Sequence, residues 1–200
     1  MGTKFSTRIW VSVVGIASIF FGSKGYADTV ISVADFGLKP DTRENAVAYV
    51  QKAIEACRGK EPITLVFPEG RYDFWPQYAH EKNYYETNTY DVFPKRLAML
   101  FEGLHNITVD GNGSQFVMHD RIQPITVENC DGVTLKNFSI DWDIPLTDQA
   151  RVTKVGSDFF EIEINVLESP YIIEDGKLVF VGEGWKSALG SMIEFESDTH

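Results

Sequence analysis

Cysteine and histidine are scarce in this chain of 200 residues, which contains two cysteines and four histidines. The spacing of Cys57 and Cys130 fits no metal-binding or redox motif. His105 and His119 also lack the spacing of a zinc site, so ordinary surface or core positions are expected for them. An oxidising compartment would permit a disulfide, but Cys57 lies on the apolar stripe of a predicted helix, which favours two separate buried thiols. The sequence therefore predicts neither a metal site nor a cofactor.

Positive charge is also in short supply. The chain has 18 lysines and arginines against 29 aspartates and glutamates, which gives a formal net charge of -11. A chain this acidic repels phosphate backbones and anionic lipid surfaces. We therefore expect no nucleic acid and no membrane surface among its partners.

Acidic residues are absent from the N-terminal stretch, which has a character of its own. A positively charged start precedes an apolar run over residues 9–21, and Gly25 and Ala27 then place small residues where a signal peptidase cleaves. We predict a signal peptide over residues 1–27 and a mature chain from Asp28. The alternative, a transmembrane anchor, needs about 20 apolar residues, and this run is shorter. We expect an exported protein, periplasmic or secreted, that is not membrane-bound after cleavage.

Helical periodicity is rare in the mature chain, where one convincing helix is predicted. Its apolar side chains recur at steps of three and four residues, namely Val47, Val50, Ile54 and Cys57. Asp41 is expected to cap its start with Glu44 as the reciprocal partner, and Gly59 to mark its end. A lone helix before a series of strands suits a lid over the open end of a stack of strands.

Two stretches 26 residues apart share one pattern, and they organise the prediction of the fold. Residues 102–111 align with residues 128–137, which pairs Ile107 with Val133, and the strand alternation changes phase at Asn137. Repeats of roughly 20–30 residues mark solenoids, in which each unit buries its apolar face against its neighbours. Two strands of an ordinary sandwich could match in the same way. The pattern favours a parallel β-helix over that alternative.

Other strands are expected on both sides of this repeat. Alternation predicts further strands before it and a long surface loop over residues 78–94, the strands being residues 30–33, 63–67, 72–75 and 97–101. After Pro145 the short connections indicate antiparallel pairing, with a hairpin and two later strands over residues 150–155, 159–164, 177–181 and 191–195. We therefore divide the mature chain into a lid with the first coils, residues 28–147, and an antiparallel β insertion, residues 148–200.

Several motifs resemble known families. The segments VADFG (residues 33–37) and FPEGRY (residues 67–72) resemble the start of the pectin-lyase-like right-handed β-helix superfamily. Three more specific segments resemble glycoside hydrolase family 110, the bacterial inverting exo-α-1,3-galactosidases, and these are residues 107–117, 135–142 and 182–185. The resemblance runs from about residue 31 to residue 185 and so covers nearly all of the mature segment.

This resemblance implies an all-β fold, a right-handed parallel β-helix with an N-terminal capping helix and a small antiparallel β-barrel or sheet insertion. It also implies hydrolysis with inversion at the anomeric carbon, without a metal. The family's catalytic carboxylates lie in later coils, beyond residue 200, so no residue here inherits the acid or base role. A chain that ended at His200 is therefore expected to be inactive.

Substrate-binding candidates within the chain are Asp141, Asp143 and Trp185. The two aspartates face the same way on one strand, about 6.6 Å apart at the backbone, which fits a pair of carboxylates around a sugar. A solvated outer face or a turn ligand explains them more simply, and substrate hydrogen bonding fits the pair better than a catalytic role does. Trp185 could stack on a sugar face, or pack the insertion against the rest of the chain. The segment 110–113 lacks the alternating acids of a calcium loop, and tight-turn chemistry explains it better.

The sequence thus predicts an exported glycoside hydrolase that removes terminal α-1,3-linked galactose, seen through its N-terminal portion. Its expected partner is a galactose-terminated oligosaccharide or glycoconjugate. A polysaccharide lyase and a non-catalytic β-helix adhesin or carbohydrate-binding module are the alternatives, since this type of fold hosts all three. The lyase would need a calcium-binding acid cluster with a basic residue on one face, and neither is visible in the sequence.

Overall fold

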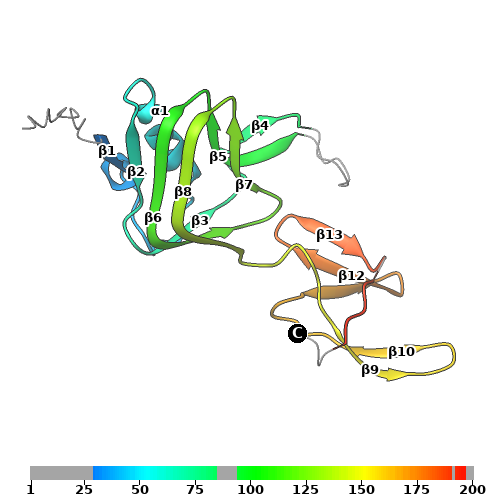
Figure 1. Ribbon diagram of the computed structural model, residues 1–200. Coiled ribbons are helices and arrows are strands. Elements are labelled where there is room, and N and C mark those ends of the chain that lie inside the picture. Colours follow the sequence, from blue (N-terminus) through cyan, green and yellow to red (C-terminus); the bar gives the residue numbers. More distant parts are fainter. Residues whose placement is uncertain (1–28, 85–93, 191, 197–200) are drawn as a thin grey trace, which may run out of the picture.

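The computed structural model describes residues 29–84, 94–190 and 192–196 (Figure 1). The predicted signal peptide over residues 1–27 lies outside this part of the chain, so export stays a prediction. No helix within the described residues is long and apolar enough to span a membrane.

A five-stranded sheet in which every pairing is parallel forms the largest sheet of the first part of the chain (Figure 1). Its long strand β6 pairs with β2 along its first half, with β3 along its second half, and with β8 on the other side. Its strands are β1 (Thr29–Ser32), β2 (Ile63–Val66), β3 (Arg71–Phe74), β6 (His105–Met118) and β8 (Asp131–Trp142).

The register of β6 against β8 confirms the 26-residue alignment. Ile107 pairs with Val133, and Val109 pairs with Leu135. Ile107 and Val109 are buried, while Val133 packs against the same core from a partly buried position. Asn137, where the alternation changes phase, has a φ angle of 60°, and Asn106 in the aligned stretch has a φ angle of 50°, both in the left-handed region that asparagine tolerates.

A second, three-stranded sheet runs beside the first and contains β4 (His80–Lys82), β5 (Lys95–Glu102) and β7 (Gln123–Glu128). β5 and β7 are parallel, and Glu102 pairs with Glu128 as the alignment predicts. β4 is antiparallel to β5. The long loop predicted over residues 78–94 is therefore wrong at its start, where β4 forms, and residues 85–93 lie outside the described residues.

The helix α1 (Val47–Cys57) covers the core, with the short 3-10 helix η1 (Val33–Phe36) near it. The predicted apolar stripe is buried, and Cys57 and Cys130 are both free thiols. The predicted cap is wrong. Asp41 Oδ1 accepts a hydrogen bond from the amide of Arg71, and the side chain of Asn45 binds the amide of Val47 instead.

Aromatic side chains fill the middle of the core between the parallel strands and α1. Phe116 lies at the centre, with its ring centroid 4.7 Å from that of Phe67 and 4.8 Å from that of Phe138. Tyr72 and Phe74 pack edge-on against it. Because β3, β6 and β8 each contribute to this cluster, the packing fixes the ends of these three strands relative to one another.

The chain after residue 148 forms two small antiparallel sheets (Figure 1). The predicted hairpin is confirmed as β9 (Arg151–Val155) with β10 (Phe160–Glu163). The other sheet contains β11 (Tyr171–Glu174), β12 (Lys177–Gly182) and β13 (Trp185–Ala188). The strand predicted over residues 191–195 is wrong, because residues 192–196 have no regular structure.

The predicted fold class, a right-handed parallel β-helix, is also wrong. The described residues form four separate small sheets with one α-helix instead of a solenoid. The repeat does not continue at a constant length: the offset between β6 and β8 is 26 residues at Asp110, which pairs with Lys136, but 24 at Ser114, which pairs with Phe138. The alignment of the two stretches therefore indicates that β6 and β8 pair in parallel, but it does not establish repeating coils.

Candidate functional site

The parallel register brings the residues that follow three strands, Trp75, His119 and Asp143, to one edge of the five-stranded sheet. Phe74 pairs with Met118, and Met118 pairs with Trp142, so the residues that follow these strand ends come together. The amide of His119 donates to the carbonyl of Phe74 at 3.0 Å, and the amide of Asp143 donates to the carbonyl of Met118 at 3.1 Å. Neighbouring strand ends thus place His119 and Asp143 side by side.

Five charged or titratable side chains meet at this edge. They are Arg71, Asp73, His119, Asp143 and Glu183. We call them the junction cluster, because Glu183 comes from the second part of the chain and the other four come from the first. The turn that carries Glu183 lies very close to this edge: a Cβ atom on Gly184 would be 2.5 Å from Oδ2 of Asp120. Gly184 also has a φ of 76°, in the left-handed region that favours glycine.

Asp73 is the buried centre of the junction cluster. Its side chain is fully buried, and the guanidinium of Arg71 binds it with both Nε, at 3.0 Å, and Nη2, at 2.6 Å. His119 Nε2 lies 2.9 Å from the same carboxylate. Burial raises the pKa of Asp73, but the hydrogen bonds from Arg71 and His119 outweigh it and the pKa is lowered. Asp73 is therefore a stably ionised carboxylate.

Asp143 connects the junction cluster to solvent. Arg71 Nη2 lies 2.6 Å from Oδ1 of Asp143, whose side chain is 38% exposed. Arg43 adds a second guanidinium at 3.6 Å from the same oxygen. The bonds to Asp73 and Asp143 raise the pKa of Arg71 against the effect of its burial. An open carboxylate beside two guanidinium groups is an arrangement that can bind hydroxyl groups of a polar ligand.

His119 joins the two parts of the chain. Its ring stacks on Trp75 with centroids 3.8 Å apart and planes 10° apart. Nε2 faces Asp73, while Nδ1 faces Glu183 at 2.8 Å. Ionised carboxylates only accept hydrogen bonds, so both contacts are satisfied together when each ring nitrogen carries a hydrogen or one carboxyl group is protonated. This side chain therefore couples the buried acid to the β12–β13 turn.

Asp73, His119 and Asp143 also have the donor atoms of a metal site, since one ligand atom from each lies within 4.8 Å of the others. Arg71 Nη2 already lies 2.6 Å from an oxygen of each carboxylate. A divalent cation would have to displace that guanidinium. The donor set thus suits an ion-pair network better than a metal.

A second charged group lies on the three-stranded sheet. Lys82 Nζ binds Glu102 at 2.7 Å and Glu128 at 3.0 Å, and the hydroxyl of Tyr84 donates to Glu128. The bonds from Tyr84 and Lys82 lower the pKa of Glu128. These partly exposed acids are held by one lysine, which makes the group a clamp between β4, β5 and β7.

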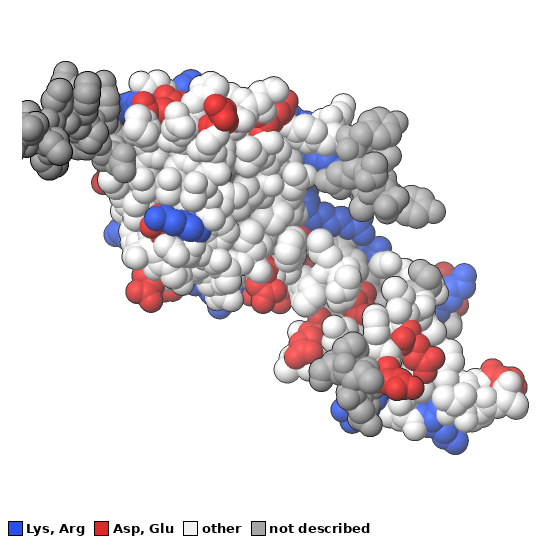
Figure 2. Space-filling view, viewed as in Figure 1, with Lys and Arg blue, Asp and Glu red and all other residues white. Residues whose placement is uncertain are grey.

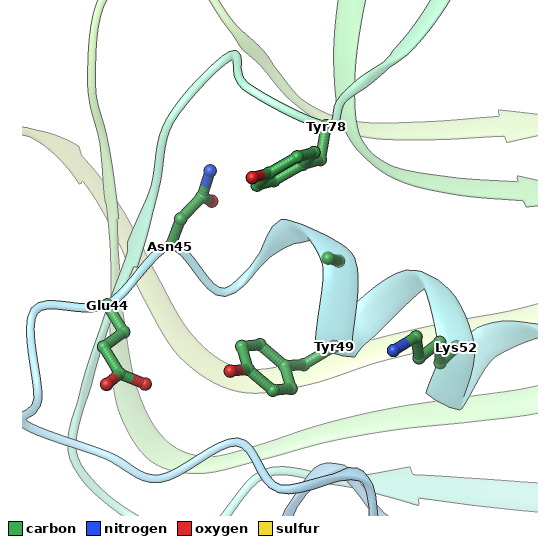
Figure 3. A pocket seen from close by; sticks show the side chains of 6 residues that line it. Glu44, Asn45, Tyr49, Lys52 and Tyr78 are labelled. Carbon is green, nitrogen blue, oxygen red and sulfur yellow. The ribbon is translucent and has the colours of Figure 1, made fainter.

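A shallow pocket of about 380 Å³ lies over the start of α1. Figure 3 shows Tyr49 and Lys52 pointing from the helix and Tyr78 from the segment that follows β3. This pocket shares no residue with the junction cluster. Asn45, which lines the pocket, accepts a hydrogen bond from the backbone amide of Trp75, whose ring stacks on His119.

Comparison with known proteins gives consistent results along the chain. Residues 148–200 match the family model described as GLAA-B beta-barrel domain I, a β-barrel domain and not a parallel β-helix. The chain is 60% identical over 174 residues to alpha-1,3-galactosidase B of Bacteroides thetaiotaomicron, covering 87% of this chain and 28% of that protein. It is 36% identical over 169 residues to alpha-1,3-galactosidase A of Shewanella woodyi, covering 84% and 28%.

The chain thus resembles part of the α-1,3-galactosidases that it matches. A third relative, alpha-1,3-galactosidase A of Bacteroides fragilis, is 35% identical over 177 residues, covering 86% of this chain and 29% of that protein. The chain therefore spans less than a third of the length of these relatives. The family resemblance inferred from the motifs is confirmed.

The three site residues predicted from the sequence lie in different environments in the structure. Asp143 joins the junction cluster. Asp141 is exposed, and its carboxylate accepts a hydrogen bond from the amide of Trp142, its neighbour. Trp185 is 8% exposed and lies beneath Arg121, whose Cζ is 5.9 Å from the ring centroid, so it does not offer an open face to a sugar. A substrate-binding role for the three stays a prediction.

The sequence interpretation missed most of the junction cluster, namely Arg71, Asp73, His119 and Glu183. His119 was expected to be an ordinary surface or core histidine, yet it is buried between two carboxylates. The change of offset from 26 to 24 residues along β6 and β8 is the reason, because a constant repeat does not align His119 with Asp143. The extra residues Asn112 and Gly113, both at positive φ, were the available signal.

Proposed function

We propose that the full-length protein is a glycoside hydrolase that removes terminal α-1,3-linked galactose with inversion. The observation that carries this proposal is the 60% identity over 174 residues to a protein named alpha-1,3-galactosidase B. Two further relatives with α-1,3-galactosidase names, from different organisms, support the same assignment. Its partner would be a galactose-terminated oligosaccharide or glycoconjugate.

Inverting hydrolysis needs two carboxyl groups about 6.5–9.5 Å apart, one to protonate the leaving oxygen and one to activate water. Asp73 is poorly suited to either role, since it is fully buried and bound by both Arg71 and His119. We therefore assign the acid and the base to residues beyond this segment. The export inferred from residues 1–27 belongs to this proposal as well, because it would bring the enzyme to extracellular glycans.

Within this segment, Asp143 is the residue that we propose to bind substrate hydroxyl groups. It is partly exposed, it is oriented by Arg71, and Arg43 lies beside it. A carboxylate that is held in place loses little side-chain freedom when it binds a sugar. Asp141 lies two residues earlier, within β8, and has no such support, so it provides a matched control.

The test of the reaction uses the full-length protein with an α-1,3-linked galactobioside. Free galactose should be released, and proton NMR should detect the β-anomer first, because inversion of an α-linkage yields the β-sugar. Initial release of the α-anomer would contradict inversion. Formation of an unsaturated uronate from a uronic-acid polymer, without galactose release, would favour a lyase instead.

The test of Asp143 compares two single variants of the full-length enzyme. Asp143→Asn should raise KM about tenfold, as expected for the loss of a charge-assisted hydrogen bond of about 1.4 kcal/mol. Asp141→Asn should leave KM within about twofold, since no other element fixes its carboxylate. Equal effects of the two substitutions on KM would contradict the proposed role of Asp143.

A further inference from the structure

The pocket over α1 combines two aromatic rings with charged side chains. Glu44, Asn45, Ala48, Tyr49, Lys52 and Tyr78 line its volume of about 380 Å³, which lies at the lower end of the range of small-molecule sites. Tyr49 is partly buried and packs against the core, while Tyr78 is 64% exposed. Figure 3 shows the two rings on either side of the first turns of the helix.

The backbone that carries Tyr78 is held in an uncommon conformation. Tyr78 has a φ of 70°, in the left-handed region, which costs a bulky residue free energy. Two side chains hold this segment on the helix: Asn45 Nδ2 donates to the carbonyl of Gln77 at 2.8 Å, and Gln51 Nε2 donates to the carbonyl of Tyr78 at 2.9 Å. The fold thus fixes an exposed aromatic side chain at the rim of a pocket.

Four of the polar side chains that line this pocket make no polar contact within the described part of the chain, while Asn45 is used to hold the backbone. Among the described residues, the side chains of Glu44, Lys52, Tyr49 and Tyr78 have no hydrogen-bond or ion-pair partner. One carboxylate, one ammonium group and two phenol groups are therefore available to a ligand. The backbone amide of Glu44 is already bound by Thr42, so its side chain projects from a defined position.

We propose that this pocket is a binding site for a neutral hexose unit, separate from the junction cluster. A pyranose has an apolar C–H face that packs on an aromatic ring, and hydroxyl groups that both a carboxylate and an ammonium group can bind. Opposite charges on Glu44 and Lys52 suit an uncharged polar ligand better than an anion or a cation. The site goes beyond the proposed hydrolysis, since it needs no reaction and uses no residue of the cluster.

The experiment uses the full-length protein with a fluorinated tyrosine introduced at position 78 alone, observed by fluorine NMR. The probe is methyl β-D-galactopyranoside, which an α-galactosidase does not cleave. We expect the resonance to shift with the probe concentration and to saturate in the millimolar range. A protein labelled at Tyr171, an exposed tyrosine on β11, should show no saturable shift.

Two substitutions then test the site with the label at Tyr49. Tyr78→Ala and Lys52→Met should each weaken probe binding at least fivefold, while the unliganded spectrum should show one folded species. Absence of a saturable shift at positions 78 and 49 would overturn the proposal. So would binding that is unchanged in both variants. Hydrolysis of the α-1,3-galactobioside is measured separately, so the failure of one proposal does not decide the other.

Discussion

The mostly parallel sheets before residue 146 and the antiparallel sheets after residue 148 use apolar side chains in opposite ways. In the first part, β2, β5 and β6 turn their apolar residues into one continuous core beneath α1. Among the described residues of the second part, the buried hydrophobic side chains are those of Val179, Phe180 and Trp185. Leu167 is 85% exposed and Val155 is 73% exposed. The second part has strands and hairpins but little interior.

Because the second part has little interior of its own, its stability depends on contacts with the first part. Backbone pairing alone gives small hairpins marginal stability in water. The antiparallel sheets therefore rely on contacts with their surroundings, which among the described residues include the junction cluster and the packing of Trp185 beneath Arg121. The first part also has a mostly uncharged face over β6 and β8, with acidic side chains at its upper and lower rims (Figure 2).

The largest expected effect is on the core of the first part. Phe116→Ala removes the ring at the centre of the aromatic cluster, and we expect it to lower the free energy of unfolding by about 4 kcal/mol. Urea denaturation followed by far-UV circular dichroism measures this loss. Phe160→Ala in β10, where the side chain is 44% exposed, is the matched control and should cost less than about 1 kcal/mol. Similar losses would erase the contrast between the two parts.

The next effect tests the buried acid of the junction cluster. Asp73→Asn leaves Arg71 and His119 without their anionic partner, and we expect a loss on the order of 3 kcal/mol in the free energy of unfolding. Asp143→Asn, which acts on the exposed end of the same network, should cost less. A larger loss for Asp143→Asn would place the centre of the network at the surface.

The same carboxylate predicts a pH dependence with a definite sign. The pKa of Asp73 is lowered in the folded protein, so the unfolded chain takes up its proton first as the pH falls. This stabilisation is complete above the unfolded pKa of about 4 and declines as the pH falls from there through the folded pKa. Urea midpoints between pH 6 and pH 3 should decline more steeply in the wild type than in Asp73→Asn. Parallel curves would contradict the assignment.

A smaller effect tests the attachment of the second part. Glu183→Gln weakens the contact with His119 Nδ1, and we expect a local loss of about 1 kcal/mol, which corresponds to roughly fivefold faster hydrogen exchange of β12 amides. Exchange in β6 should stay the same. Glu174→Gln, which removes an exposed ion pair with Lys186 within the same sheet, serves as the control and should leave the exchange rate within twofold.

The smallest effect is expected on the outer hairpin. Lys154 and Glu161 form an ion pair at 3.3 Å with both side chains more than half exposed. Such pairs contribute little because water and salt screen them, so Glu161→Gln should change the free energy of unfolding by less than about 0.5 kcal/mol. A loss above about 1 kcal/mol would show that the second part depends on its own surface charges.

Local patterns predicted most of the elements. The apolar stripe identified α1, alternation located β2, β5, β6 and β12, and the 26-residue alignment gave the pairing of Ile107 with Val133. These features depend on neighbouring residues or on one simple repeat. The cap of α1 was missed because the fold uses Asn45, which also binds the amide of Trp75, thirty residues away.

The fold class and the junction cluster were harder to predict for a related reason. Parallel pairing over β6 and β8 looks the same in a solenoid and in a short sheet, and the change of offset at Asp110 is decided by backbone geometry. Asp73, His119 and Glu183 come from three distant segments, and nothing in their local sequence links them. Asp143 was found because it belongs to an alternating run, while its partner Arg71 was not.

The segment 119–121 has one more consequence, for spectroscopy. Three tryptophans lie in the described part of the chain, and each contacts this segment: Trp75 stacks on His119, the indole N–H of Trp142 donates to the carbonyl of Asp120, and Trp185 lies beneath Arg121. Indole emission depends on the polarity and the quenching groups around the ring. The intrinsic fluorescence of this region is thus concentrated at a single place, and it can record movement there without any attached dye.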